Sequence, residues 1–216
     1  MKNAIILGAG GFAREVADIF RDLGSSGEFR LLGFVDRDDS RKGETLNDTA
    51  ILGAFPLAGV EGPLFGVAGA GEIEPRRRQI AELTAANVTP ITLVHPSVIM
   101  SPYCRLGAGT IVTIGSILTA NITVGAHCLI NYGVTVGHDV VMGDNCVLSP
   151  GVHVSGWCEI GDDCYIGTGA VLLPKVRLGK GAVVGAGAVV TRDVAAGVTV
   201  VGIPARPLAQ KGGGSA

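Results

Sequence analysis

Aromatic side chains, net charge and long apolar runs are all scarce in this sequence. Phe, Trp and Tyr make up only 5% of its 216 residues, and the formal net charge is −2. No apolar run approaches the roughly 20 residues that a membrane-spanning helix needs. Because 47% of the residues are nevertheless hydrophobic, intrinsic disorder is excluded. Ten prolines and the lack of a strict Gly-X-Y period exclude a collagen-like chain.

A secretory leader and a disulfide framework are not indicated either. The apolar run near the start covers only residues 4–7, whereas a signal peptide has an apolar run of about 7–15 residues. The five cysteines, an odd number, suit a reducing compartment. We therefore expect a cytoplasmic protein without membrane insertion, and a flexible glycine-rich tail over residues 208–216.

Glycine is abundant, with 34 residues, and the second half of the chain has a six-residue repeat. An aliphatic residue recurs at every sixth position from Val94 to Val190, and a small or β-branched residue follows it four positions later. This period is the signature of a hexapeptide solenoid, in which the aliphatic residue points inward and the small residue fits the corner. Three hexads close one triangular coil, so the repeat predicts a left-handed parallel β-helix with a coil of 18 residues.

The repeat also accounts for the cysteines. All five occupy the small inward position: Cys104, Cys128, Cys146, Cys158 and Cys164. We therefore interpret them as small buried hydrophobic residues, not as zinc ligands or nucleophiles. None of the aromatic residues in the repeat occupies an inward position, as a thin core requires.

Residues 1–93 alternate between strands and helices, which predicts a Rossmann-like α/β domain with a parallel sheet ahead of the β-helix over residues 94–207. Strands are expected at 4–7, 31–35 and 64–67, and helices at 14–23 and 72–86. The segment Arg76-Arg77-Arg78 is expected to form a solvated face, because it lacks the interleaved aromatic residues of a nucleic-acid patch.

A glycine-rich turn, Gly8-x-Gly10-x-x-Ala13, follows the first expected strand. Backbone N–H groups at a helix N-terminus bind phosphate well, and Asp36 is suited to accept a ribose hydroxyl. About 90 residues are too few for both halves of a dinucleotide-binding domain. Phosphate or nucleotide-sugar binding is therefore favoured over nicotinamide redox chemistry, and a tight turn without a ligand is the remaining alternative.

Four segments of the chain resemble one family of acyltransferases. They are GAGGFAREV over residues 8–16, GFVD over 33–36, Asn131 with His138-Asp139, and VGIPAR over 201–206. The sequence resembles the sugar O- and N-acetyltransferases among the hexapeptide-repeat acyltransferases. This family includes sialic acid O-acetyltransferases and the N-acetyltransferases of bacillosamine and perosamine synthesis. The resemblance implies a homotrimer with acetyl-CoA between neighbouring β-helices and a nucleotide sugar at the N-terminal domain; no metal is expected.

The resemblance also implies which residues bind the substrate. They are Gly10, Gly11, Phe12, Asp36, Arg37 and Asn131, the last contacting the substrate amine or an ordered water. Phe12 stands where many members of the family have histidine, and Val147 where several have a second histidine near the thioester. We therefore expect backbone amides to recognise the acetyl group.

His138 is the expected general base. An acetyl acceptor must lose a proton, and of the four histidines only His138 is followed directly by an acid, Asp139. A carboxylate can hold the imidazole in the required tautomer. Because one coil contains 18 residues, Gly156 stacks over His138, and its N–H is the expected oxyanion donor, as at the matching position of the family.

Basic residues are concentrated near the C-terminal end. Residues 165–211 contain six basic residues and one acidic residue, whereas acids outnumber bases in the rest of the chain. Such an excess favours binding of the CoA phosphates. The expected contacts are Lys175, Arg177, Lys180 and Arg206.

The sequence thus predicts transfer of acetyl from acetyl-CoA to the amine of a UDP- or GDP-linked 4-amino-4,6-dideoxy sugar. O-acetylation of a sialic acid or a related hydroxyl is the alternative within the same chemistry. A metal enzyme of the carbonic anhydrase type would need His127, His138 and His153, which fall on different faces of the prism. A non-catalytic scaffold is a further alternative.

Overall fold

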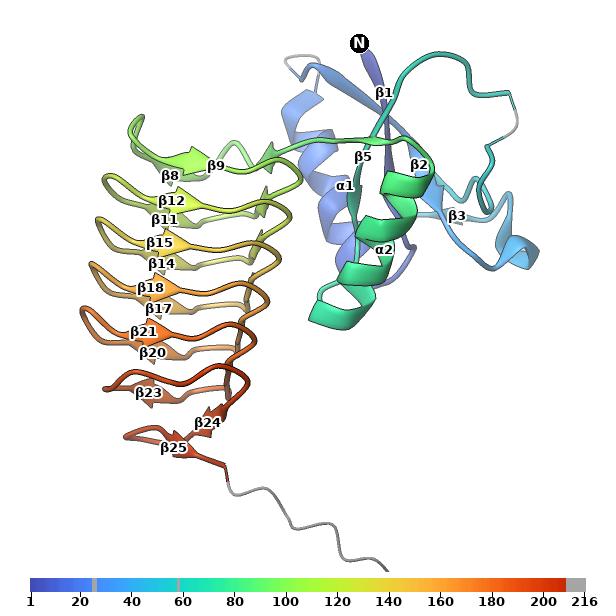
Figure 1. Ribbon diagram of the computed structural model, residues 1–216. Helices are drawn as coiled ribbons and strands as arrows, with labels where there is room; N and C mark the ends of the chain where they lie inside the picture. The colour runs from blue at the N-terminus through green and yellow to red at the C-terminus, as the bar shows by residue number, and fades with distance from the viewer. Residues whose placement is uncertain (25–26, 58, 209–216) are drawn as a thin grey trace, which may run out of the picture.

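The computed structural model describes residues 1–24, 27–57 and 59–208, so the expected tail beyond Leu208 lies outside the described residues. Figure 1 shows an N-terminal α/β unit beside a tall stack of coils. Among the residues that the structure describes, no helix is long and apolar enough to cross a lipid bilayer.

The N-terminal unit is built on a parallel sheet with the strand order β2-β1-β5-β6. Its elements are β1 (Lys2–Leu7), α1 (Gly11–Leu23), β2 (Phe29–Val35), the 3-10 helix η2 (Asp39–Arg41), β3 (Thr45–Leu46), β4 (Thr49–Ala50), β5 (Leu64–Ala68), α2 (Ile73–Ala85) and β6 (Thr89–Pro90). The expected alternation of strands and helices is confirmed. The two-residue strands β3, β4 and β6 were not predicted, because so short a segment has no readable periodicity.

The second half of the described chain is a β-helix with three sheets, which we number I to III. Sheet I contains β7 (Leu93–Val94), β10 (Ile111–Val112), β13 (Leu129–Ile130), β16 (Val147–Leu148), β19 (Tyr165–Ile166), β22 (Val183–Val184), β24 (Thr199–Val201) and β25 (Arg206–Pro207). Sheet II contains β8 (Ile99–Met100), β11 (Ile117–Leu118), β14 (Thr135–Val136), β17 (His153–Val154), β20 (Val171–Leu172) and β23 (Val189–Val190). Sheet III contains β9 (Arg105–Leu106), β12 (Thr123–Val124), β15 (Val141–Met142), β18 (Glu159–Ile160) and β21 (Arg177–Leu178).

The coil of 18 residues predicted from the hexads is confirmed by the strand register. Residues one coil apart pair in parallel, as Ile111 does with Leu129 and Ile117 with Thr135. The last coil is shorter, because Leu178 forms its bridge with Val194. The chain then turns back, so that β25 pairs with β24 in the antiparallel direction.

The interior of the β-helix is narrow and filled with aliphatic and small residues. Four cysteines have 0% exposure, Cys104 in the first coil is partly exposed, and all five are free thiols. The prediction that the cysteines serve as small buried residues is confirmed. The aromatic residues lie outside this core, with Tyr103, Tyr132 and Trp157 exposed.

Sheet I faces the N-terminal unit (Figure 1), and its outward side chains form the junction between the two halves. Ile111, Leu129 and Val147 are buried there in one cluster with apolar residues of α1. The other two sheets remain uncovered by the N-terminal unit. Any site on them therefore faces away from this junction.

Arg76 of α2 is fully buried at the same junction, which corrects the expectation that Arg76, Arg77 and Arg78 form a solvated face. Its guanidinium donates to the carbonyls of Ala68 (3.0 Å), Ala70 (3.1 Å) and His127 (2.9 Å). Burial lowers the pKa of Arg76 to about 10, so it is charged at neutral pH. Local sequence gave no sign that this arginine satisfies three carbonyls, since His127 is distant in the chain.

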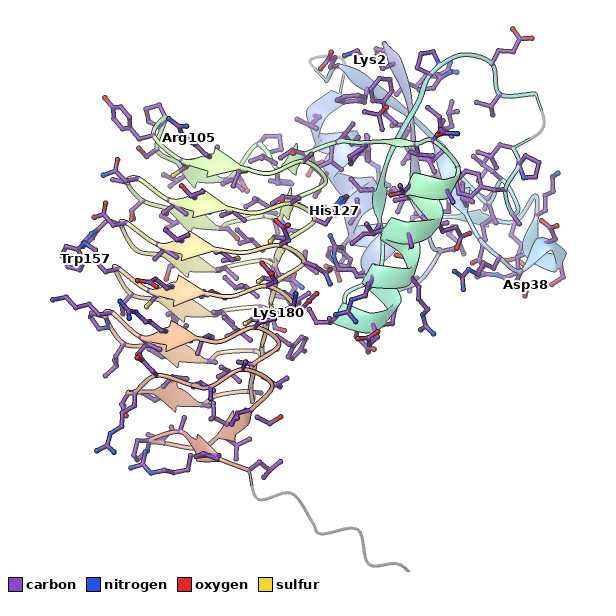
Figure 2. The ribbon with its side chains drawn as sticks, in the orientation of Figure 1. Lys2, Asp38, Arg105, His127, Trp157 and Lys180 are labelled. Atoms are coloured by element: carbon purple, nitrogen blue, oxygen red, sulfur yellow. The ribbon has the colours of Figure 1, made fainter. Side chains whose placement is uncertain are left out.

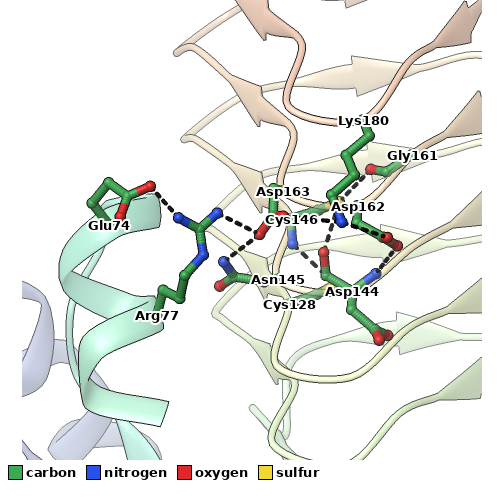
Figure 3. Close-up of polar contacts among 10 residues, drawn as sticks. All are labelled: Glu74, Arg77, Cys128, Asp144, Asn145, Cys146, Gly161, Asp162, Asp163 and Lys180. Atoms are coloured by element: carbon green, nitrogen blue, oxygen red, sulfur yellow. Dashed lines mark hydrogen bonds and ion pairs between the residues drawn. The ribbon is translucent and has the colours of Figure 1, made fainter. Parts of the chain in front are cut away.

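A polar network fixes the N-terminal end of α2 to the corner between sheets III and I (Figure 3). Arg77 pairs with Glu74 and, at 3.0 Å, with Asp163, which also accepts a hydrogen bond of 2.9 Å from Asn145. Lys180 lies 3.7 Å from Asp163 and 3.4 Å from Asp162. The network and Arg76 together hold α2 against the β-helix.

Candidate active site

The loop after β14 places His138 and Asp139 at the corner between sheets II and III, hereafter the II/III corner. The Nδ1 atom of His138 lies 2.8 Å from Oδ2 of Asp139. Hydrogen bonds from His138 and Asn121 hold the pKa of the Asp139 carboxyl below its usual range, so this group accepts and Nδ1 carries the proton. The Nε2 atom of the neutral imidazole is then the free basic nitrogen.

Gly156 lies against the ring of His138, one coil further along. A β-carbon placed on Gly156 would be only 2.8 Å from both Cε1 and Nε2 of His138. The absence of a side chain therefore permits the contact between this backbone and the imidazole. In the described part of the chain, no acceptor is found for the Gly156 N–H. This N–H is available to a charge that develops beside Nε2.

Trp157 completes the corner and was missed by the sequence reasoning. Its ring meets that of His138 edge to face, with centroids 4.3 Å apart, while 52% of the residue remains exposed. The ammonium of Lys175 lies 5.6 Å from the centre of the indole. The coil repeat is the signal that could have found this residue, because Trp157 stands one coil beyond Asp139.

A broad groove of about 870 Å³ runs over sheet III from this corner, with Asp139, Trp157 and Arg177 among its lining residues. Two of the four basic residues expected to bind CoA, Lys175 and Arg177, lie beside it. Arg177 also pairs with Glu159 at 3.3 Å. The groove thus runs from the exposed His138–Asp139 pair to Arg177, and Glu159 and Asp193 are its other charged lining residues.

The other two basic residues lie elsewhere. Lys180 is at the III/I corner beside Asp162 and Asp163, and Figure 2 shows it on the side of the N-terminal unit, away from Trp157. Arg206 is exposed on β25 and donates to the carbonyl of Ala205. The structure does not bring Lys180 together with the other expected CoA contacts.

A second cleft, of about 260 Å³, lies where β1 and β2 end. Gly8, Asp36 and Arg37 line it, together with Arg78 and Gln79 of α2, which the sequence reasoning missed. Asp36 pairs with Arg41 at 3.2 Å, and Arg37 pairs with Glu82 at 2.6 Å. The glycine turn and the two residues after β2 are therefore brought together, as expected for parallel strands.

The turn itself starts α1. Gly10 is the N-cap, and Gly11 and Phe12 form the first helical residues. A β-carbon on Gly10 would meet no heavy atom within 4 Å, so packing inside the chain does not require glycine there. The first N–H groups of a helix have no partner within the helix, which makes this end suited to an anion.

The two clefts are far apart in one chain. Figure 2 shows Trp157, which contacts the ring of His138, and Asp38, which lies shortly after β2, on opposite sides of the molecule. Asn131 lies at the corner between sheets I and II, so the structure does not place it beside His138. Val147 is buried in the junction with 1% exposure, and its position is thus remote from the II/III corner.

The histidines do not form a metal site within the described chain. His138 is at the II/III corner, His127 is at the III/I corner, and His153 is on sheet II. No group of three or more His, Cys, Asp or Glu residues suited to a metal ion occurs among the described residues.

A hexapeptide β-helix with an exposed His–Asp pair beside a long groove defines an acyltransferase of the hexapeptide-repeat class. The sequence matches the family model "Bacterial transferase hexapeptide (six repeats)" over residues 139–173 and 158–192. The model "PglD N-terminal domain" matches residues 3–63. A comparison with curated proteins finds no match.

Several solved structures are similar over nearly the whole chain. The acetyltransferase domain of PglB from Neisseria gonorrhoeae is 30% identical, with 96% of this chain and 100% of that chain covered and a TM-score of 0.86. WeeI from Acinetobacter baumannii is 31% identical, with the same coverage and a TM-score of 0.86. A mutant of perosamine N-acetyltransferase from Caulobacter crescentus, in complex with CoA and GDP-perosamine, is 28% identical, with 97% and 98% covered and a TM-score of 0.86.

The chain belongs to the sugar O-/N-acetyltransferase family of the hexapeptide-repeat acyltransferases. The family resemblance and the left-handed β-helix predicted from the sequence are thereby confirmed.

Proposed function

We propose that the protein transfers the acetyl group of acetyl-CoA to the amine of a nucleotide-linked 4-amino-4,6-dideoxy sugar. The observation that carries this proposal is the pair His138–Asp139, with the imidazole edge of Cε1 and Nε2 close to Gly156 and beside the sheet III groove. The similar perosamine enzyme was solved with CoA and GDP-perosamine, which supports a nucleotide amino sugar as the acceptor.

The residues of the II/III corner are suited to each step of the transfer. Nε2 of His138 takes the proton of the attacking amine, while Asp139 stabilises the imidazolium that forms. The amine nitrogen bonds to the thioester carbonyl carbon, and the N–H of Gly156 stabilises the oxyanion. Collapse of the tetrahedral intermediate breaks the C–S bond, and the proton passes from His138 to the departing CoA thiolate.

The two substrates are assigned to the two clefts. Gly10, Gly11 and Phe12 at the start of α1 would hold the phosphates, and Asp36 and Arg37 the nucleoside. Acetyl-CoA would lie in the sheet III groove, with Lys175 and Arg177 near its phosphates. Lys180 and Arg206 remain proposed CoA contacts, and each would contact the CoA that is bound in the groove of a neighbouring subunit.

We further propose a homotrimer that packs through sheet II. Sheet I is covered by the N-terminal unit and sheet III carries charged residues. The outward residues of sheet II include no Asp, Glu, Lys or Arg: Ile99, Ile117, Thr135, His153, Val171 and Val189. Ile99 is 67% exposed and Ile117 is 37% exposed in the single chain. An apolar exposed face of this kind is typical of a subunit interface.

Packing around sheet II would also complete the active site. The I/II corner of one subunit, with Asn131, would adjoin the II/III corner of the next, with His138. The nucleotide cleft of one chain would then serve the base of its neighbour. A cytoplasmic location is part of the proposal and is supported by the five free cysteines.

A thiol-release assay tests the function. Purified protein is incubated with acetyl-CoA and a panel of UDP- and GDP-linked 4-amino-4,6-dideoxy sugars, with the corresponding 4-hydroxy sugars as matched controls. We expect CoA release with at least one amino sugar and an N-acetyl product by mass spectrometry. Release with hydroxyl acceptors alone would contradict N-acetylation.

A further inference from the structure

Trp157 has a conformation that its own side chain does not favour. Its φ angle is 58°, in the left-handed region. Of the ten described non-glycine residues with positive φ, seven are Asn or Asp, whose short polar side chains tolerate this conformation. A bulky residue in this region costs conformational energy and persists where the surroundings or the function require it.

Burial does not explain the tryptophan either. More than half of the residue is exposed, and its ring is not part of the apolar core of the β-helix. Its contacts are instead with the II/III corner: the imidazole of His138 on one side and the ammonium of Lys175 on the other. The strained and exposed residue therefore contacts the proposed base directly.

Asn121 occupies the corresponding position one coil before Asp139, and it too has a positive φ, of 59°. Its Nδ2 donates a hydrogen bond of 3.2 Å to Oδ1 of Asp139, whose other oxygen binds His138. One residue per coil thus forms a column at this corner: Asn121, Asp139, Trp157 and Lys175. Within the column Asp139 and Trp157 contact the imidazole directly, and Asn121 reaches it through Asp139.

We propose that Trp157 and Asn121 are positioning residues for His138. Asn121 fixes the Asp139 carboxylate, which in turn selects the tautomer with the proton on Nδ1. Trp157 fixes the plane of the imidazole by ring contact, so that Nε2 stays beside the N–H of Gly156. This inference rests on the proposed function, in which His138 is the base.

Glycine substitutions separate this role from a structural one, because glycine adopts positive φ without strain. For Trp157→Gly we expect kcat to fall about tenfold or more, with KM for the sugar nucleotide within about twofold. The midpoint of thermal unfolding should equal or exceed that of the unsubstituted protein. Trp157→Phe, which keeps a ring, should restore most of kcat.

Asn87→Gly is the matched control. Asn87 is exposed, has a φ of 53° and lies after α2, away from the II/III corner. We expect this variant to keep full kcat. If Trp157→Gly also keeps full kcat, or if it loses kcat only in parallel with its thermal stability, the positioning role of Trp157 is wrong.

An NMR measurement tests the same inference without turnover. The ¹⁵N shifts of His138 should indicate one tautomer, with the proton on Nδ1, in the unsubstituted protein at a pH where the ring is neutral. Asn121→Gly should give a mixture of tautomers, and an unchanged spectrum would refute the role of Asn121. The NMR result does not depend on the acceptor. An enzyme that is inactive on every amino sugar would therefore contradict the proposed function, while the positioning of His138 would still be decided by the NMR spectra.

Discussion

The chemistry at the residue scale depends on which nitrogen of His138 is free and on how closely the backbone of Gly156 approaches it. Asp139 binds Nδ1 at 2.8 Å, and the next coil presents a backbone without a side chain to the same ring. The base and the proposed oxyanion donor are therefore fixed relative to each other by one coil of the β-helix.

Removal of the base should lower turnover strongly and leave the groove intact. For His138→Ala we expect kcat to fall roughly 10²–10⁴-fold, because the imidazole beside Gly156 is the group proposed to take the amine proton. Acetyl-CoA binding, measured by calorimetry, should be nearly unchanged, since the CoA phosphates contact other residues. Full activity in this variant would rule out His138 as the base.

A methyl group at Gly156 should disturb the same site without removing any functional atom. In Gly156→Ala the new β-carbon would lie 2.8 Å from the His138 ring, so the imidazole must move. We expect kcat to fall about 100-fold, since small displacements of catalytic groups have effects of this size. Gly151→Ala is a poor control, because Gly151 has a positive φ and alanine would be strained there. Gly10→Ala is the better comparison, since a β-carbon on Gly10 meets no other atom. This variant affects the other cleft and should raise KM for the sugar nucleotide.

Sequence reasoning identified the residues that chemistry restricts to few types. A histidine followed by an acid, and a glycine one coil later, are visible in the sequence once the 18-residue period is known. Trp157 was missed because the 18-residue period was applied to His138 and Gly156 but not to Asp139, one coil before the tryptophan. Lys180 was grouped by charge alone, and charge does not specify which corner of the prism a side chain occupies.

At the scale of elements, α2 is attached to the β-helix by an arginine whose hydrogen bonds are all to backbone carbonyls. Arg76 joins the end of β5 to the III/I corner at His127. The hexads predicted the 18-residue coils because each repeats the same local pattern, whereas the shorter last coil, which pairs Leu178 with Val194, departs from it. The junction could not be predicted in this way, because it depends on contacts between residues that are distant in the sequence.

Replacement of Arg76 should destabilise the protein strongly. Arg76→Met keeps the length of the side chain but leaves the carbonyls of Ala68, Ala70 and His127 without a donor. We expect a loss of about 3 kcal/mol in the free energy of unfolding, measured by urea denaturation. Arg14→Met, at an exposed position of α1, is the control and should change the stability by less than about 0.5 kcal/mol. Equal stability of the two variants would contradict the role assigned to Arg76.

At the scale of the whole molecule, the nucleotide cleft and the base lie on opposite sides of one chain (Figure 2). A single chain therefore cannot bring both substrates together through these two sites. The proposed trimer removes this difficulty, because each base would face the cleft of a neighbour.

A charge on sheet II should prevent assembly. For Ile117→Lys we expect light scattering to give the mass of one chain, 21.9 kDa, instead of three times that value, together with loss of activity. Thr123→Lys, at the corresponding position of sheet III, should remain trimeric. A trimeric Ile117→Lys protein would exclude sheet II as the interface.

Two inactive variants should restore activity when they assemble together. His138→Ala keeps the nucleotide cleft and Asp36→Ala keeps the base, so a mixed trimer contains some sites with both parts intact. Coexpression in equal amounts should give up to about one quarter of normal activity, because each side of a competent site must come from one particular variant. No recovery in a verified mixed trimer would indicate that each site lies within one chain.

The coil period also restricts how the length of this protein can change. Insertion of one hexad between His138 and Gly156 would turn every later residue by one face of the prism, so Gly156, Trp157 and Lys175 would leave the II/III corner together. Insertion of three hexads would restore the face but displace these residues along the axis by roughly 4.8 Å, the spacing of neighbouring strands. Insertions and deletions in this segment should therefore be selected against even when the repeat itself tolerates them, whereas additional coils beyond the groove leave the distance between base and oxyanion donor unchanged.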